Sequence, residues 1–172
     1  MTGKTFWLTG LPCSGKTTIG KRLVERIEKD HGLKAVYLDG DVVRSTINSD
    51  LGFSEVDRKE NIRRTIEITR LLNGLGITVV AGFISPYRSM RKKAREAIGD
   101  GFFEIFINAP IEVCEKRDVK GMYKEARSGK RLGFTGVTAP YEEPEMPELV
   151  VDTGVQSIDE SVLAIMSLIE KN

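Results

Sequence analysis

Apolar runs alternate with helical spacings along the chain, and this alternation predicts an α/β fold. Runs of apolar, β-branched and aromatic residues predict strands at 5–9, 35–38, 77–84, 102–107 and 149–151. Between them, apolar residues at helical spacing predict helices at 16–29, from 54 to about 74 or 76, and at 88–98, 111–117 and 158–169. Strands that alternate with helices predict a parallel sheet covered by helices on both faces, which is a three-layer fold.

One segment lacks this periodicity. Between Asp118 and Pro147 the apolar spacing weakens while glycine and proline accumulate, so we expect a mobile lid over roughly 118–147. A chain of 172 residues with 40% hydrophobic content can bury one core, and we expect a single domain over 1–172.

Composition argues against several classes of partner and location. The 26 basic and 25 acidic side chains leave a net charge of +1, so no overall field draws the protein to nucleic acid or to a membrane. Two cysteines are too few for a secreted disulfide scaffold, and from the N-terminal residues and the apolar runs we expect neither a signal peptide nor a membrane-spanning segment. We expect a cytoplasmic protein.

A phosphate-binding motif lies between the first strand and the first helix. The segment GLPCSGKT at 10–17 matches G-x-x-x-x-G-K-[ST] at every fixed position. Gly10 and Gly15 permit close backbone approach, Lys16 supplies a positive charge, and the Thr17 hydroxyl can ligate Mg²⁺. An ordinary glycine turn would explain the glycines but not the Lys-Thr pair in this strand–helix setting. We therefore expect the chain to bind a nucleoside triphosphate.

Polar residues follow the second and third strands, whose carboxyl ends should meet the phosphate loop at one edge of the sheet. They are Asp39, Asp41 and Ser85. Asp39 has two open readings, a turn residue or a carboxylate beside Mg²⁺ and an incoming hydroxyl. For Asp41 a functional role is favoured, because Arg44 follows one helical turn later.

Two basic groups leave alternatives open. Arg44, Arg58 and Arg64 could bind phosphate or sulfate oxygens, and Asn61 a ribose or base; alternatively the group could form a solvated face with salt bridges. The helix at 88–98 resembles a nucleic-acid patch in charge but lacks interleaved aromatic residues, so we expect a solvated face. Its basic residues are Arg88, Arg91, Lys92, Lys93 and Arg95.

Three single residues also have simple structural interpretations. Phe134, between flexible glycines, could stack on a purine or could anchor the lid to the core. Cys13 occupies a variable position of the motif, so a small filler is the default expectation. His31 stands at a helix end and is expected to cap it.

Several stretches together resemble the adenylylsulfate kinase family, whose members phosphorylate adenosine 5′-phosphosulfate at its 3′-hydroxyl. They occur in the family's order and cover nearly the whole chain. They are GLPCSGKTT (10–18), LDGDVVR (38–44), DLGFSEVDRKENIRR (50–64), FISPYR (83–88), APIEVCEKRDVKGMYKEAR (109–127), GFTG (133–136) and PYEEP (140–144). The chain departs from the family at Cys13, at Gly82 and in the lid sequence SGKRLGFTG, and none of these changes removes a catalytic group.

The resemblance implies a P-loop kinase fold and a role for each matching position. Lys16, Asp41 and Ser85 would be catalytic, with Asp41 beside the 3′-hydroxyl, and Mg²⁺ would be held at Thr17. ATP would be bound by Gly10, Leu11, Pro12, Cys13, Ser14, Gly15, Lys16, Thr17, Thr18 and Arg117. Adenylylsulfate would be bound by Asp41, Arg44, Phe53, Arg58, Asn61, Ile84, Ser85, Lys120 and Phe134, with Phe53 and Phe134 on either side of its adenine.

The resemblance leaves two roles for Ser85, a phosphoserine intermediate or a positioning group. We expect direct in-line transfer, because positioning and charge neutralisation account for most phosphoryl-transfer catalysis. Family members commonly pair, so a homodimer is expected. Two other functions stay open: another small-molecule P-loop kinase, and a non-catalytic nucleotide-sensing domain.

Overall fold

Five parallel strands form one sheet in the order β2-β3-β1-β4-β5. The computed structural model describes residues 3–170, so 1, 2, 171 and 172 of the expected domain lie outside the described residues. The strands are β1 (Thr5–Thr9), β2 (Ala35–Asp39), β3 (Thr78–Gly82), β4 (Phe102–Asn108) and β5 (Leu149–Asp152). All five were expected from the apolar runs, and their parallel pairing confirms the fold class.

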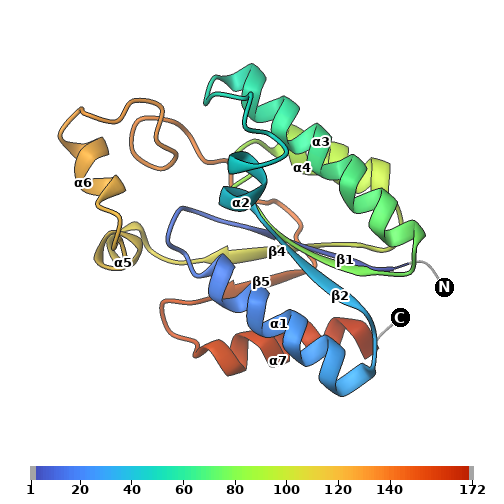
Figure 1. The fold of residues 1–172 in the computed structure, drawn as a ribbon. Coiled ribbons are helices and arrows are strands. Elements are labelled where there is room, and N and C mark those ends of the chain that lie inside the picture. Colours follow the sequence, from blue (N-terminus) through green and yellow to red (C-terminus); the bar gives the residue numbers. More distant parts are fainter. Residues whose placement is uncertain (1–2, 171–172) are drawn as a thin grey trace.

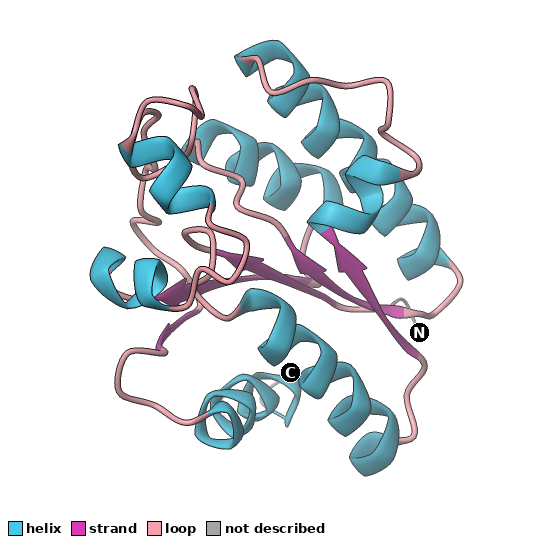
Figure 2. Ribbon diagram, turned by 60° about the vertical axis from the view of Figure 1, so that its left-hand side comes forward, coloured by secondary structure: helices cyan, strands magenta, loops and turns pink. Residues whose placement is uncertain are grey.

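Helices cover both faces of the sheet, as Figures 1 and 2 show. On one face lie α1 (Lys16–His31) and α7 (Ile158–Glu170). On the other face lie α3 (Glu55–Gly74) and α4 (Arg88–Ile98), with the short α2 (Gly40–Ser45) at the end of β2. Two short helices, α5 (Ile111–Lys116) and α6 (Met122–Arg127), follow β4 and project to one side.

Strand alternation divides the core into two apolar layers. In β1, Phe6 and Leu8 pack with residues of α1 and α7, whereas Trp7 packs with residues of α3 and α4. Successive side chains of a strand point to opposite faces, so a central strand that is apolar at every position contributes to both layers. All five residues of β1 are buried, which fixes the position of its carboxyl end.

Local signals set the helix ends where the sequence predicts them. The Ser54 hydroxyl accepts a hydrogen bond from the Asp57 amide at 3.1 Å and caps α3. Gly32 ends α1 with a left-handed backbone at φ 64°, a conformation that glycine adopts without strain. His31 lies in the last turn, where a cation is favourable, but the cap itself is Gly32.

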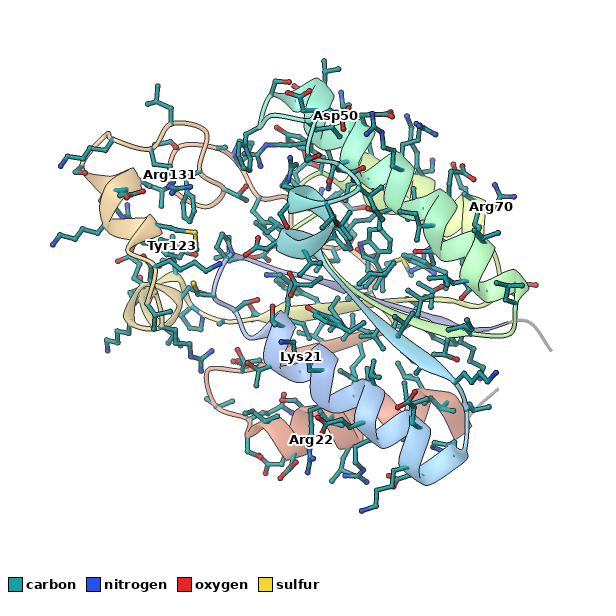
Figure 3. All side chains as sticks on the ribbon, viewed as in Figure 1. Lys21, Arg22, Asp50, Arg70, Tyr123 and Arg131 are labelled. Atoms are coloured by element: carbon teal, nitrogen blue, oxygen red, sulfur yellow. The ribbon has the colours of Figure 1, made fainter. Side chains whose placement is uncertain are left out.

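The lid segment is more ordered than its glycine content suggests. It contains α6, and its Tyr123 and Phe134 belong to a third apolar cluster with Cys114 of α5. The apolar spacing of the sequence does not predict α6, because six residues are too few for a periodicity that can be recognised. Figure 3 shows Tyr123 and Arg131 on this segment, at the opposite end of the molecule from Arg70 on α3. Its mobility stays a prediction.

Among the helices of residues 3–170, none is both long and apolar enough to cross a membrane.

Leu23 provides a test of the α1–sheet layer, because its side chain is completely buried. Leu23→Ala is expected to lower the free energy of unfolding by about 2–5 kcal/mol, since it removes apolar contacts and leaves a cavity. Urea-induced unfolding monitored by circular dichroism would measure the change in the free energy of unfolding. Leu71→Ala on α3, where the side chain is 69% exposed, is the control and should change stability by less than about 0.5 kcal/mol. Equal losses for both variants would contradict the described layer.

Candidate functional site

The phosphate loop joins the end of β1 to the start of α1, and its shape depends on two glycines. Gly10 has φ 153°, and a β-carbon there would lie 2.3 Å from the Ile107 carbonyl oxygen of β4. Gly15 has φ 105° and precedes the first turn of α1. Cys13 also has a positive φ, 61°, which is uncommon outside glycine. The loop therefore lies close against β4, with its backbone at the positive end of α1.

Lys16 begins α1 and folds back over this loop. Its ammonium donates to the Gly10 carbonyl at 2.9 Å and to the Leu11 carbonyl at 2.6 Å. Burial lowers the pKa of Lys16 to about 8, although the nearby Asp41 and Asp39 carboxylates favour the charged form. The ammonium group of Lys16, the predicted phosphate-binding cation, thus lies against the carbonyls of the phosphate loop.

Thr17 and Asp39 come together at the ends of α1 and β2. The Thr17 hydroxyl donates to Asp39 Oδ2 at 3.1 Å, and Asp39 Oδ1 accepts from the Asp41 amide at 2.9 Å. One Asp39 oxygen thus caps α2, as the turn interpretation expects, while the other bonds Thr17 of the phosphate loop; a place beside Mg²⁺ stays a prediction. A hydroxyl and a carboxylate oxygen are hard donors that suit Mg²⁺. Within residues 3–170 there is no cluster of three His, Cys, Asp or Glu side chains that could hold a metal ion.

Asp41 is the point at which the lid reaches α2. Its carboxylate pairs with the Lys120 ammonium at 2.8 Å, across 79 residues of sequence. Both side chains are largely exposed, so the pair adds little to stability. The structure brings these two predicted residues together beside Asp39.

Arg44, Phe53 and Arg58 form a second group on the same side. The Arg44 guanidinium lies over the Phe53 ring at 4.7 Å and donates to the Gly52 carbonyl at 2.7 Å. Arg58 donates from Nε to the Phe53 carbonyl at 2.9 Å and from Nη1 to the Thr135 hydroxyl at 2.9 Å. Arg58 Nη2 also donates to the Gly133 carbonyl. Arg58 therefore ties the start of α3 to the lid instead of lying on a solvated face.

The two predicted aromatic residues lie in different surroundings. Phe53 is 67% exposed, whereas Phe134 is 9% exposed and meets the Tyr123 ring edge-on at a centroid distance of 4.9 Å. Among the described residues, Phe53 and Phe134 do not form an aromatic pair with each other. In this arrangement Phe134 anchors the lid, which is one of its two predicted roles.

Asn61 is buried within α3, where a purely exposed polar face was one expectation. Its Oδ1 accepts a hydrogen bond from Asn48 Nδ2 at 2.9 Å. Arg64 instead pairs with Asp50 at 2.7 Å and with Glu60 at 2.9 Å. Asn48 has no sequence signal that would identify it, because it lies outside regular structure between α2 and α3.

Ser85 follows β3 in a strained backbone conformation, with φ 37°. Its side chain is buried, its Oγ accepts from Trp7 Nε1 at 3.1 Å, and it donates to Thr9 Oγ1 at 3.1 Å. Thr9 Oγ1 in turn donates to the Ile84 carbonyl at 2.8 Å. The predicted Ile84–Ser85 segment is therefore fixed directly to the end of β1, beside the phosphate loop.

Arg117 contacts the phosphate loop through Thr153, whereas Ser85 contacts the end of β1 that leads into the loop. It donates to the Thr153 hydroxyl at 3.1 Å and to the Thr153 carbonyl at 2.6 Å, and the Thr153 hydroxyl donates to the Ser14 carbonyl at 2.8 Å. A cavity of about 460 Å³ lies here. Its lining includes Cys13, Gly15, Lys16, Thr17, Thr18, Arg117, Thr153 and Gln156. Sequence reasoning missed Thr153 and Gln156, which follow a short strand without a recognisable motif.

The solvated face expected for α4 is wrong at one position. Arg91 is 2% exposed and pairs with Glu104 of β4 at 2.6 Å, whereas Lys92 and Lys93 are exposed. The signal that could have found this pair is Glu104 itself, the only charged residue in the strand sequence FFEIFIN. A carboxylate in such a strand requires a buried partner.

Comparison with known proteins gives a consistent family. A family model described as adenylylsulphate kinase matches residues 2–152. The adenylyl-sulfate kinase of Picosynechococcus sp. is 49% identical over 164 residues, covering 95% of this chain and 92% of that protein. The solved structure of the Mycobacterium tuberculosis APS kinase in complex with AMPPNP and APS has a TM-score of 0.92 at 42% identity, and 98% of each chain is covered.

A more distant solved structure differs in length. A hexameric APS kinase from Thiobacillus denitrificans has a TM-score of 0.74 at 30% identity, with 99% of this chain and 29% of that chain covered. The family model covers most of the chain, and the curated relative and the structure with bound nucleotides are 49% and 42% identical over nearly all of it. The chain therefore belongs to the adenylylsulfate kinase family.

Proposed function

We propose that this chain transfers the γ-phosphate of ATP to the 3′-hydroxyl of adenosine 5′-phosphosulfate, giving 3′-phosphoadenylylsulfate and ADP. One observation supports this most strongly. The phosphate loop with Lys16 shares one edge of the sheet with the acceptor-side group, in which Asp41, Arg58 and Ser85 come from three different elements. A kinase needs both substrates at one edge, in line for transfer.

On the donor side, backbone amides of the phosphate loop and Lys16 would bind the ATP phosphates. Lys16 would exchange its bonds to the Gly10 and Leu11 carbonyls for bonds to phosphate oxygens. Arg117 would lie beside the adenine in the cavity that Thr153 and Gln156 line. Residues from Gly10 to Thr18 complete this half of the site.

Mg²⁺ would be held by the Thr17 hydroxyl together with the ATP phosphates, with the Asp39 carboxylate close by. When bound, the ion would neutralise charge on the transferred phosphoryl group. Thr17 and Asp39 would keep their oxygen atoms oriented toward that position.

On the acceptor side, Asp41 would orient the 3′-hydroxyl or accept its proton. Arg44 and Arg58 would bind the phosphosulfate oxygens, and Asn61 the ribose, with the Ile84–Ser85 backbone nearby. Lys120 already reaches Asp41 from the lid. Phe53 would contact the substrate adenine by its exposed ring, and Phe134 would form the other wall after leaving part of its contact with Tyr123.

The surroundings of Ser85 support direct transfer over a phosphoserine intermediate. Its Oγ is buried and engaged with Trp7 and Thr9, so a covalent phosphate there would displace both partners. A positioning role uses the same contacts unchanged. We further propose that the protein is a cytoplasmic homodimer, in keeping with its two free cysteines and with the pairing common in its family.

An acceptor panel tests the function directly. With purified protein and Mg-ATP, ATP consumption is expected only with adenylylsulfate, and not with gluconate, shikimate or a nucleoside monophosphate. Lys16→Ala should abolish it, because the loop then lacks its phosphate-binding cation. Equal turnover with another acceptor would favour a different P-loop kinase. Nucleotide binding by calorimetry without any transfer would favour a sensing domain.

Arg58 provides a test of the acceptor side. Arg58→Ala is expected to raise the KM for adenylylsulfate about 10- to 100-fold and that for ATP by less than about twofold, because charge-assisted contacts contribute roughly 1.5–3 kcal/mol. Arg63→Ala is the matched control, since Arg63 is on the same helix and pairs only locally with Glu60 at 2.7 Å. Steady-state kinetics with each substrate varied would measure both. Equal losses for ATP and adenylylsulfate would contradict the assignment of Arg58.

Lys16 makes ATP binding dependent on pH. Its pKa is lowered to about 8 by burial, and bound phosphates would raise it, so only the protonated form binds tightly. Affinity is therefore full below about pH 8 and falls as the pH rises above it, by about tenfold between pH 7 and pH 9. Calorimetric titration with Mg-ATP would measure this change. Lys16→Met should bind weakly and with little pH dependence, and a wild-type affinity that stays constant to pH 9 would contradict the prediction.

A further inference from the structure

Arg91 is a buried charged residue to which the proposed chemistry assigns no role. Its three guanidinium nitrogens each bond a different segment of the chain. Nε donates to Glu104 Oε1 of β4 at 2.6 Å, Nη1 to the Ser85 carbonyl at 2.6 Å, and Nη2 to the Glu142 carbonyl at 2.6 Å. Stability alone does not require such a group, because well-packed apolar residues replace buried ion pairs without loss in several proteins.

The first consequence of these bonds concerns Ser85. Its positive φ of 37° is unfavourable for a residue with a β-carbon, and such conformations persist only where the surroundings fix them. Arg91 bonds the carbonyl of Ser85, while Trp7 and Thr9 bond its hydroxyl. The backbone and the side chain of Ser85 are thus held from two different sides.

The second consequence concerns the end of the lid. Besides its carbonyl bond to Arg91, Glu142 donates its amide to the Pro86 carbonyl at 2.8 Å. The neighbouring Tyr141 lies under the Arg91 guanidinium at 5.7 Å, and its hydroxyl is 2.9 Å from Thr9 Oγ1. Arg91, Tyr141, Thr9 and Ser85 therefore form a closed set of contacts that joins β1, the segment after β3 and the lid.

We propose that Arg91 is a positioning residue for the acceptor side of the site. It fixes the Ile84–Ser85 segment and the carboxyl-terminal end of the lid relative to each other. This inference rests on the proposed function, in which the Ile84–Ser85 segment and the lid residues Lys120 and Phe134 line the adenylylsulfate site. The ATP side is built from the phosphate loop, Arg117 and Thr153, whose described bonds do not include Arg91.

Arg91→Lys separates the bridging role from the charge. A lysine keeps a positive charge opposite Glu104, but its single nitrogen cannot replace three diverging donors. The KM for adenylylsulfate is expected to rise about tenfold or more, with the KM for ATP changed by less than about twofold. Trp7, the only tryptophan of the chain, bonds Ser85 and provides a second signal. Its emission maximum or acrylamide quenching should change in the variant.

Arg95→Gln is the matched control on the next turn of α4. Arg95 pairs with Glu148 at 2.6 Å and with Glu104 at 3.7 Å, so this variant disturbs the same ionic cluster without the bonds to Ser85 and Glu142. We expect a lower unfolding temperature with both KM values and the Trp7 signal unchanged. The double variant Arg91→Met/Glu104→Gln removes the cation without leaving a buried carboxylate unpaired, and it should reproduce the selective rise in the KM for adenylylsulfate.

Several outcomes would overturn the proposal. One is a wild-type KM for adenylylsulfate and an unchanged Trp7 signal in Arg91→Lys, and another is an equal rise of both KM values in both Arg91 variants. If both Arg91 variants failed to fold while Arg95→Gln folded, Arg91 would be required for the stability of the fold and not for positioning the acceptor side. If the wild-type protein did not phosphorylate adenylylsulfate at all, the proposed function itself would be contradicted. The outcomes above, obtained beside an active wild-type protein, would contradict only the role of Arg91.

Discussion

The parallel pairing of β1 between β3 and β4 is the constraint on which the rest of the structure depends. Because all three strands run in the same direction, their carboxyl ends meet at one edge. The phosphate loop leaves β1 there, and Ser85 follows β3 a short distance away. Gly10 has no side chain because β4 lies against it, within 2.3 Å of where a β-carbon would be. Strand pairing therefore brings the phosphate loop and Ser85 to the same edge of the sheet.

The sequence was sufficient for features that depend on local patterns and insufficient for those that depend on long-range partners. The strands, the longer helices and the phosphate loop followed from periodicity and from glycine spacing. The burial of Arg91 did not, because a basic helix has the same sequence pattern whether a given arginine is solvated or paired. Its partner Glu104 lies on another element, and only the carboxylate in an apolar strand indicates it. The orientation of Phe134 and the Asn48–Asn61 contact likewise depend on packing between distant segments.

Buried polar groups in this fold lie where segments must be placed exactly relative to one another. Arg91, Glu104, Thr9 and Ser85 are all buried, and each has hydrogen-bond partners from other segments. A polar group without such partners would be costly at these positions, so the network permits few alternative arrangements. Apolar packing tolerates small shifts more readily than directional bonds do. The polar network can therefore set the position of the acceptor side more closely than the apolar core can.

The lid segment 118–147 is attached by contacts of unequal burial, and this inequality bears on the mobility predicted for it. Near its beginning, the buried Tyr123 ring packs against Phe134 and its hydroxyl donates to the Pro12 carbonyl at 2.9 Å. At its end, Glu142 is bonded to the buried Arg91. By contrast, Lys120 and Asp41 are exposed, and separating them costs little. An opening motion that breaks the Lys120–Asp41 pair but keeps the Tyr123 and Arg91 attachments would expose Asp41, while Ser85 and the phosphate loop stay in place.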